Sequence, residues 1–266
     1  MPFTERTPRV VAARALTRRQ GRDKARRFLA EGAQAIREAL AFGEVHELFT
    51  TATAAARNAD LLTQATAAGV PVSEITDKAA TALSETVTPQ GLVAVCSLVD
   101  QPLESALAAR PPLVAVLVGV SDPGNAGTVT RVADAAGAGA VLFAGDTVDP
   151  HNGKCVRSST GSVFHLPIAR SRDTATVLTA CRTAGLRLVA ADGHASLDLD
   201  AATDSGSLAV PTAWVFGSEA HGLSAEVLSL VDDVVKVPLH GRAESLNLAT
   251  AAAVCLYASA RALRGV

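Results

Sequence analysis

The spacing of apolar residues predicts a small α/β segment in the N-terminal part of the chain. Apolar residues recur at helical spacing from Arg22 to Phe42, and Gly43 follows as a natural helix end. An alanine-rich stretch predicts a second helix over Ala54–Ala68. Strands are predicted at Val45–Thr50, Val70–Ile75 and Gly91–Leu98. Helices and strands that alternate in this way are typical of an α/β domain.

A larger α/β segment follows a pair of prolines. Arg110-Pro111-Pro112 separates the two segments, because consecutive prolines cannot continue a helix. Beyond them, strand candidates alternate with helical stretches at Leu113–Val120, Ala140–Ala144, Leu186–Ala191, Ala213–Phe216 and Val234–Pro238. This pattern predicts a mostly parallel sheet with helices on both faces. We therefore predict two domains, residues 1–105 and 113–266, joined by a linker at 106–112.

In such sheets ligands bind beyond the carboxyl ends of the strands, and the first candidate loop is Ser121–Gly127. Its glycines let the backbone approach a ligand, and Asn125 is a candidate cap for a helix over Thr128–Ala136. Arg131 in that helix is suited to hold a phosphate with two hydrogen bonds. A plain turn followed by a surface arginine is the alternative explanation.

Two further loops follow later strands of the predicted sheet. In Gly217–Ser224, a glycine after a buried strand leaves room for an adenine or ribose, and Glu219 supplies a carboxylate. In His240–Asn247, the side chains of Ser245 and Asn247 lie at a helix start, where backbone N–H groups also point outward. When each loop is considered alone, turn formation or helix capping explains its residues about as well as ligand binding does.

Composition and charge narrow the classes of function. The 48% of hydrophobic and 19% of charged residues indicate a folded protein, and 3% of aromatic residues argues against rows of rings that stack on single strands. The net charge of −2 gives no global sign of nucleic-acid binding. The basic residues instead gather near the N-terminus, with Asp23 as the one acid among them: Arg6, Arg9, Arg14, Arg18, Arg19, Arg22, Lys24, Arg26 and Arg27. This arm suits phosphate contacts, and a solvated terminus is the alternative.

The sequence lacks the signatures of several other classes of protein. The four cysteines are scattered, without a nearby His at metal-ligand spacing, so we expect no metal site and no disulfide framework. No apolar run reaches the ~18–20 residues of a membrane helix, and we expect a cytoplasmic protein. Gly137 and Gly139 follow a helix, whereas a dinucleotide fingerprint follows a strand. A Rossmann oxidoreductase is therefore disfavoured, and no Walker or GxSxG motif is found.

Taken together, the three loops resemble the sequence motifs of the SpoU (TrmH-like) family of RNA ribose 2′-O-methyltransferases, in the SPOUT superfamily. The motifs are DPGNAGTVTRVADAAGA at Asp122–Ala138, WVFGSEAHGLS at Trp214–Ser224 and VPLHGRAESLNLATAAAVCLY at Val237–Tyr257. Less specifically, Arg27–Asp100 resembles the ribosomal-protein-like substrate-binding domain of members that act on rRNA. The resemblance implies 23S rRNA as the expected target. A tRNA-directed enzyme of the same family and a non-catalytic RNA-binding or ribosome-assembly protein remain the alternatives.

The resemblance also implies a fold, a cofactor and a set of site residues. The fold is an α/β domain with a trefoil knot, which forms a homodimer near the active site, and the methyl donor is S-adenosylmethionine. The implied cofactor-binding residues are Gly217, Val237, Leu239, Leu246 and Asn247, and the implied reaction centre comprises Asn125, Arg131, Glu219, Ser245 and Asn247. The expected RNA contacts are Arg18, Arg19, Arg22, Arg26, Arg27 and Arg131.

A guanidinium is a poor proton acceptor at neutral pH. We therefore expect Arg131 to clamp a phosphate and stabilise developing negative charge, with the proton passing to phosphate or water.

Overall fold

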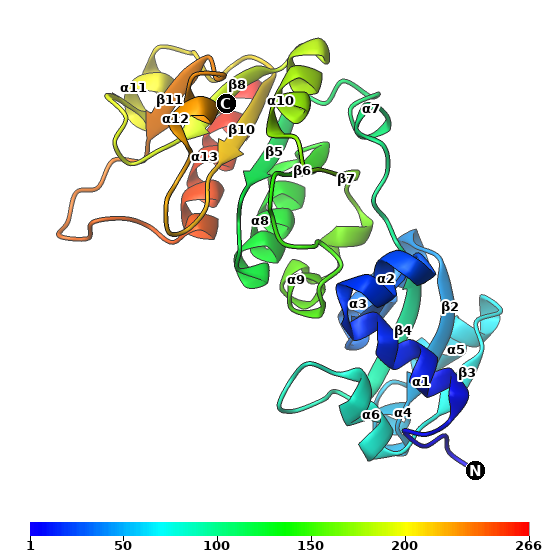
Figure 1. Cartoon of the computed structure of the whole chain (residues 1–266). Coiled ribbons are helices and arrows are strands. Elements are labelled where there is room, and N and C mark those ends of the chain that lie inside the picture. The colour runs from blue at the N-terminus through cyan, green and yellow to red at the C-terminus, as the bar shows by residue number, and fades with distance from the viewer. Residues whose placement is uncertain (266) are drawn as a thin grey trace. The chain divides into compact units, whose positions relative to one another are not determined.

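The computed structural model describes residues 1–265, which form two compact units (Figure 1). The N-terminal unit consists of Met1–Val99 and Asp149–His165, and the C-terminal unit of Asp100–Val148 and the chain from Leu166 onward. Both units are α/β, as the sequence predicted.

The N-terminal unit is built on a four-stranded sheet of order β1-β4-β2-β3. Its strands are β1 (Arg27–Glu31), β2 (Val45–Thr50), β3 (Val72–Glu74) and β4 (Leu92–Ser97). Strand β4 runs antiparallel to β1 and β2, and β2 runs parallel to β3. The helices are α1 (Pro8–Arg14), η1 (Ala15–Thr17), α2 (Arg19–Ala25), α3 (Ala33–Phe42), α4 (Ala52–Arg57), α5 (Ala59–Ala67), α6 (Asp77–Leu83), α9 (Gly153–Ser159) and η2 (Ser162–Phe164).

The prediction of one helix from Arg22 to Phe42 is wrong. The segment contains the end of α2, all of β1 and all of α3, because its buried apolar run pairs with β4 in the register Phe28↔Cys96. Gly32 then separates strand from helix with a φ of 95°, a conformation that favours glycine. The predicted helix Ala54–Ala68 is likewise divided into α4 and α5 at Asn58.

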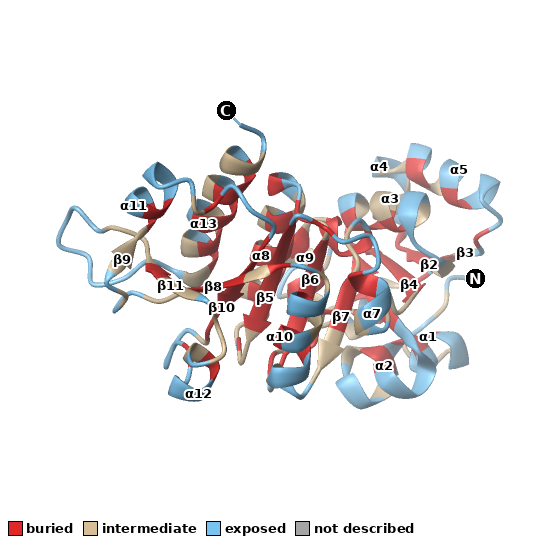
Figure 2. Ribbon diagram, turned by 90° about the horizontal axis from the view of Figure 1, so that it is seen from above, coloured by how far each residue is buried: buried red, intermediate tan, exposed pale blue. Residues whose placement is uncertain are grey.

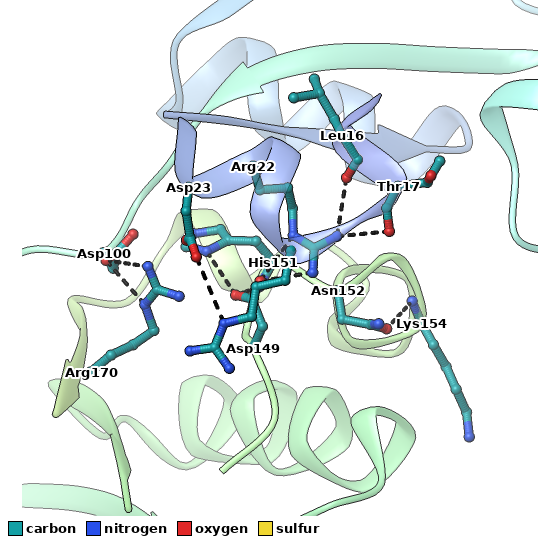
Figure 3. Close-up of polar contacts among 11 residues, drawn as sticks. Leu16, Thr17, Arg22, Asp23, Asp100, Asp149, His151, Asn152, Lys154 and Arg170 are labelled. Atoms are coloured by element: carbon teal, nitrogen blue, oxygen red, sulfur yellow. Dashed lines mark hydrogen bonds and ion pairs between the residues drawn. The ribbon is translucent and has the colours of Figure 1, made fainter. Parts of the chain in front are cut away.

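The segment Asp149–His165 folds with the N-terminal unit, although the sequence boundaries place it in the second domain. A buried polar cluster holds it there (Figure 3). The Arg22 guanidinium donates to Asp149 Oδ2, with Nε and Nη2 at 2.9 and 2.8 Å, and its Nη1 donates to the carbonyls of Leu16 and Thr17. His151 Nε2 accepts the Val99 N–H at 3.2 Å. Three segments distant in sequence, at Leu16–Arg22, Val99 and Asp149–His151, are thereby joined in one interior.

The C-terminal unit is built on a seven-stranded sheet of order β7-β6-β5-β10-β8-β11-β9, in which neighbouring strands run parallel. The strands are β5 (Leu113–Val118), β6 (Ala140–Ala144), β7 (Ile168–Ser171), β8 (Arg187–Ala191), β9 (Leu197–Asp198), β10 (Thr212–Phe216) and β11 (Asp233–Lys236). The predicted parallel sheet is confirmed, and β7 and β9 are strands that were not predicted. The helices are α7 (Leu103–Ala106), α8 (Pro123–Ala136), α10 (Thr174–Thr183), α11 (Leu199–Asp204), α12 (Ala225–Leu228) and α13 (Leu248–Leu263).

Helices cover both faces of this sheet, with α8, α11 and α13 on one side and α10 and α12 on the other (Figure 2). The central strands are buried throughout, which explains their continuous apolar sequences. Trp214 of β10 is fully buried and donates its indole N–H to Ser259 of α13 at 2.8 Å. The terminal helix is thereby fixed against the strands that carry the candidate loops.

Candidate active site

The first loop is shorter than the sequence predicted, because α8 begins at Pro123 and not at Thr128. Proline is preorganised for the first helical turn, and the preceding Asp122 caps the helix by accepting the Gly124 N–H at 2.8 Å. The predicted capping role of Asn125 is therefore wrong, since this residue lies inside the first turn. The side-chain amide of Asn125 is therefore available for hydrogen bonds to the other loops.

Glu219 is the acceptor at the centre of this site. Its carboxylate accepts hydrogen bonds from the Ser121 N–H (3.1 Å) and hydroxyl (3.3 Å), the Asp122 N–H (3.2 Å) and Asn125 Nδ2 (3.0 Å). Partial burial raises the pKa of Glu219, but the bonds from Asn125 and the backbone outweigh it, so the pKa lies below its usual value. The carboxylate is therefore ionised at neutral pH and holds the start of α8.

The backbone after β10 explains how Glu219 reaches this position. Strands β10 and β5 are parallel neighbours with Phe216 beside Leu117, so their following loops leave the same edge of the sheet. Gly217 is buried, and a Cβ there would lie 2.3 Å from the Gly222 carbonyl carbon. Ser218 and Gly222 close the turn with two backbone hydrogen bonds of 3.0 Å. The space at Gly217 is thus filled by the loop itself, and glycine is required for this close approach.

The third loop joins the site through Asn247. Its Oδ1 accepts the N–H groups of Ala249 (2.9 Å) and Thr250 (3.4 Å), which caps α13, while its Nδ2 donates to Asn125 Oδ1 at 3.0 Å. Because the Glu219 carboxylate can only accept, Asn125 must present its NH₂ group to it and its oxygen to Asn247. A Glu219–Asn125–Asn247 chain of hydrogen bonds therefore links the three loops.

Arg131 and Ser245 occupy different positions around this chain. Arg131 lies on the exposed side of α8, one helical turn beyond Gly127. Ser245 is exposed in the segment before α13 and makes no hydrogen bond within residues 1–265. Asn247 caps this helix, so capping does not explain Ser245.

Two polar residues near these loops were not singled out from the sequence. Ser121 contributes both its N–H and its hydroxyl to Glu219. Asp192 follows β8 directly, and a Cβ on Gly222 would lie 3.9 Å from its carboxylate. Their position just after parallel strands is the signal that could have identified them.

The segment between β11 and α13 has the features of a ligand-binding loop. Leu239 and Leu246 are 41% and 36% exposed. Within the described chain, the backbone groups of residues 239–246 make no hydrogen bonds to protein, and the space beside Gly241 is open. Apolar side chains next to unpaired backbone donors and acceptors fit an adenosyl group, whose ring has apolar faces and a polar edge. Val237 and Asn247 lie at the two ends of this segment.

The arginines expected to contact RNA lie mainly on the surface of the N-terminal unit. Arg18, Arg19, Arg26 and Arg27 are exposed. Arg22 differs from this expectation, because only 3% of it is exposed and its guanidinium is bound to Asp149. A buried ion pair of this kind has a structural role, so we remove Arg22 from the set of RNA contacts.

Residues 1–265 lack the groups that a metal site or a membrane-spanning helix requires. No group of three His, Cys, Asp or Glu side chains there could hold a metal ion. None of the helices in this part of the chain combines the length and apolar character that crossing a membrane requires. The four cysteines are buried, and burial raises the pKa of Cys255 to about 12, which makes its thiol a poor nucleophile.

Comparison with known proteins gave matches to both halves of the chain. The model of the SpoU rRNA Methylase family matches residues 112–257, and the MRM3-like substrate binding domain matches residues 7–94. A 23S rRNA (guanosine(2553)-2′-O)-methyltransferase, RlmP, of Bacillus subtilis is 34% identical over 236 residues, which cover 89% of each chain.

Two solved structures are similar over nearly their whole length. The AdoMet-bound rRNA methyltransferase from Sinorhizobium meliloti superposes with a TM-score of 0.81 at 31% identity, covering 99% of this chain and 98% of that one. The SpoU methyltransferase AviRb from Streptomyces viridochromogenes, in complex with AdoMet, gives 0.82 at 30% identity, covering 96% and 98%.

Proposed function

Because the chain belongs to the SpoU rRNA methylase family, we propose that it transfers a methyl group from S-adenosylmethionine to a ribose 2′-hydroxyl of 23S rRNA. The observation that carries this proposal is the Glu219–Asn125–Asn247 chain of hydrogen bonds. It assembles the three family motifs at the carboxyl ends of parallel strands, where α/β sheets bind ligands. Acting on ribosomal RNA, the protein would work in the cytoplasm.

The cofactor would lie against the segment between β11 and α13. Leu239 and Leu246 offer apolar contacts, and the backbone groups around them offer hydrogen bonds. Val237 and Asn247 lie at the two ends of the same segment, and we expect the tight turn at Gly217 to contact the cofactor as well. When bound, S-adenosylmethionine supplies an electrophilic methyl group on a sulfonium. The task left to the protein is to align the ribose oxygen and to stabilise the charge that develops on it.

We assign the charge-stabilising role to Arg131. Its positively charged guanidinium can hold the phosphate beside the target ribose with two parallel hydrogen bonds. Its charge therefore stabilises the negative charge that develops on the ribose 2′-oxygen as this oxygen loses its proton. The proton itself passes to phosphate or water. The exposed Ser245 would contact the substrate or cofactor, and Glu219 and Asn125 would act as positioning residues.

The N-terminal unit would bind the RNA outside the reaction centre. Arg18, Arg19, Arg26 and Arg27 are exposed and can each neutralise a phosphate. The match of residues 7–94 to a substrate-binding domain supports this role. The named relative's action on 23S rRNA supports rRNA over tRNA as the target.

The proposal includes a homodimer and the trefoil knot of the family. Val254 and Tyr257 of α13 are 40% and 52% exposed and lie three residues apart on one side of the helix, so they offer apolar contacts that a second copy would cover. The chain returns from β11 to pack α13 against α8, and this return is the part of the path that a knot would contain.

Incubation with methyl-labelled S-adenosylmethionine and separate 23S rRNA, 16S rRNA and tRNA transcripts tests the proposal. The expected result is label at one ribose of 23S rRNA, located by primer extension. Label in tRNA alone would instead identify a tRNA-directed enzyme of the family. A protein that binds RNA but shows no calorimetric binding of S-adenosylmethionine would be a non-catalytic RNA-binding protein.

The Glu219→Gln substitution should lower kcat by about 10- to 100-fold, because small misplacements of reacting groups are costly. Glutamine keeps one side-chain oxygen, so its NH₂ group would face another donor in either orientation: the Ser121 N–H at the Oε2 position or the Asp122 N–H at the Oε1 position. The lost hydrogen bonds would let the three loops separate. Single-turnover rates, KM for RNA and the Kd of S-adenosylmethionine would be measured. Glu226→Gln, at an exposed position of α12, is the matched control. Equal rates for the two variants would contradict the positioning role.

A further inference from the structure

The N-terminal unit contains a pocket of about 550 Å³ that the proposed reaction does not use. It lies where β1 and β2 end and β4 begins, with walls from α3, α4 and α6 and from the segment before β4. Its volume falls within the range of roughly 300–1,000 Å³ that is usual for small-ligand sites.

Close backbone packing shapes the inner wall of this pocket. The N–H groups of Gly32 and Thr51 donate to the carbonyls of Leu92 and Gly91 at 3.0 and 2.9 Å. A Cβ on Gly91 would lie 2.6 Å from the Thr51 hydroxyl, and Gly91 has a φ of 72°. The inner wall of the pocket is therefore formed by the backbone at the sheet edge.

Four polar side chains line the pocket and make no side-chain hydrogen bond or ion pair within residues 1–265. They are Thr53, Arg57, Asp77 and Gln90. The guanidinium only donates, the carboxylate only accepts, and the hydroxyl and the amide do both. Small apolar groups, including Ala54 and Ala80, complete the lining.

This combination of groups fits a nucleobase better than a phosphate. A phosphate needs donors and positive charge, and the Asp77 carboxylate would repel it. A base edge carries donors and acceptors side by side, and its faces pack against apolar groups or an arginine plane. Sequence-specific RNA recognition commonly reads unstacked bases in this way.

We propose that this pocket binds one unstacked nucleobase of the RNA substrate. The inference rests on the proposed function and adds the location of a base-reading subsite in the substrate-binding unit. Arg57 packs on or bonds to the base, and Asp77, Thr53 and Gln90 bond its edge. One pocket that reads one base also agrees with the scarcity of aromatic residues, at 3% of the chain.

Two variants with one matched control test the pocket. Thr81→Trp places a ring at the lining of the pocket, and Gln90→Leu removes an amide while keeping a similar side-chain volume. Thr63→Trp is the control, because Thr63 and Thr81 are both exposed helical threonines whose hydroxyls donate to the carbonyl four residues earlier. The probe is a 23S rRNA transcript containing 4-thiouridine or 6-thioguanosine, and the readouts are Kd by filter binding and the site of photo-crosslinking.

We expect wild-type crosslinks within residues 51–58 or 89–92, and a Kd about tenfold weaker for Thr81→Trp and Gln90→Leu than for Thr63→Trp. The proposal is overturned if both variants bind within about twofold of the control, if crosslinks avoid the pocket, or if the wild type does not bind the transcript. Methyl transfer is scored separately. Pocket-dependent binding without methylation would refute the proposed function alone, and methylation with pocket-independent binding would refute this inference alone.

Discussion

The Arg131→Ala variant is expected to lose about 10²–10³-fold in the single-turnover rate of methyl transfer while it binds S-adenosylmethionine normally. The physical reason is the loss of a fixed positive fork beside the target ribose, which removes both the phosphate clamp and the stabilisation of negative charge on the 2′-oxygen. Rapid-quench measurement with saturating enzyme gives the rate, and calorimetry gives the cofactor Kd.

Comparison variants sharpen this result. Arg131→Lys should retain an intermediate rate, because lysine keeps the charge but lacks the planar fork. Arg182→Ala is the control, since Arg182 is a surface arginine paired with Asp232 at 2.7 Å and lies outside the proposed site. A near-normal rate for Arg131→Ala with normal cofactor binding would refute the role assigned to Arg131.

The Arg22→Ala variant should destabilise the N-terminal unit by about 3–5 kcal/mol, the usual effect of leaving a buried charge without its partner. Arg22 and Asp149 are 3% and 5% exposed, and the guanidinium also satisfies the Leu16 and Thr17 carbonyls. Urea unfolding followed by circular dichroism would measure the change. Arg19→Ala, which breaks an exposed pair of 3.8 Å with Asp23, should cost less than about 1 kcal/mol.

The pH dependence of unfolding provides a second readout for the same cluster. Burial raises the pKa of Asp149, but the hydrogen bond and charge of His151 and the charge of Arg22 outweigh it, so the pKa lies well below its usual value. A lowered pKa stabilises the fold above about pH 4, the ordinary Asp value, and this contribution is lost as the pH falls towards the lowered pKa. Without the Arg22 charge the pKa of Asp149 in the folded protein rises towards its ordinary value, so the stability lost on acidification should become smaller. The double variant Arg22→Met/Asp149→Leu should recover part of the stability, and no recovery would contradict a buried-charge origin.

The parallel sheet and the positions of its main strands along the chain were predictable from local sequence, whereas the order of the strands within the sheet was not. Strands β5, β6, β8 and β10 are buried on both faces, so each reads as an apolar run without the polar alternation of a half-exposed strand. Strand β7 was missed because it is short and includes Arg170, and β9 has two residues. Neither segment differs enough in sequence from a loop to be recognised as a strand without the strand it pairs with.

Contacts between residues distant in sequence determined which elements form the N-terminal unit. The Phe28-Leu29-Ala30 run is compatible with a helix or a strand, and pairing with β4 selects the strand. Arg22 looked like one more cation of a basic arm, because burial against Asp149 depends on a segment more than a hundred residues later. No local pattern shows that Asp149–His165 belongs with this unit.

The candidate site was likewise predictable from the sequence in part, and the tertiary structure decided the rest. Its residue types and their three loops were readable from the sequence, because each loop follows an apolar strand and carries glycine with polar side chains. Capping by Asp122, the ionised Glu219 with four donors around it, and the link from Asn125 to Asn247 were not readable. The bonds to Glu219 and the bond from Asn247 to Asn125 join residues more than ninety positions apart, and the order of strands in the folded sheet brings their loops to one edge. Local sequence thus specifies which groups are available for chemistry, and the packing of β10 beside β5 specifies how they meet.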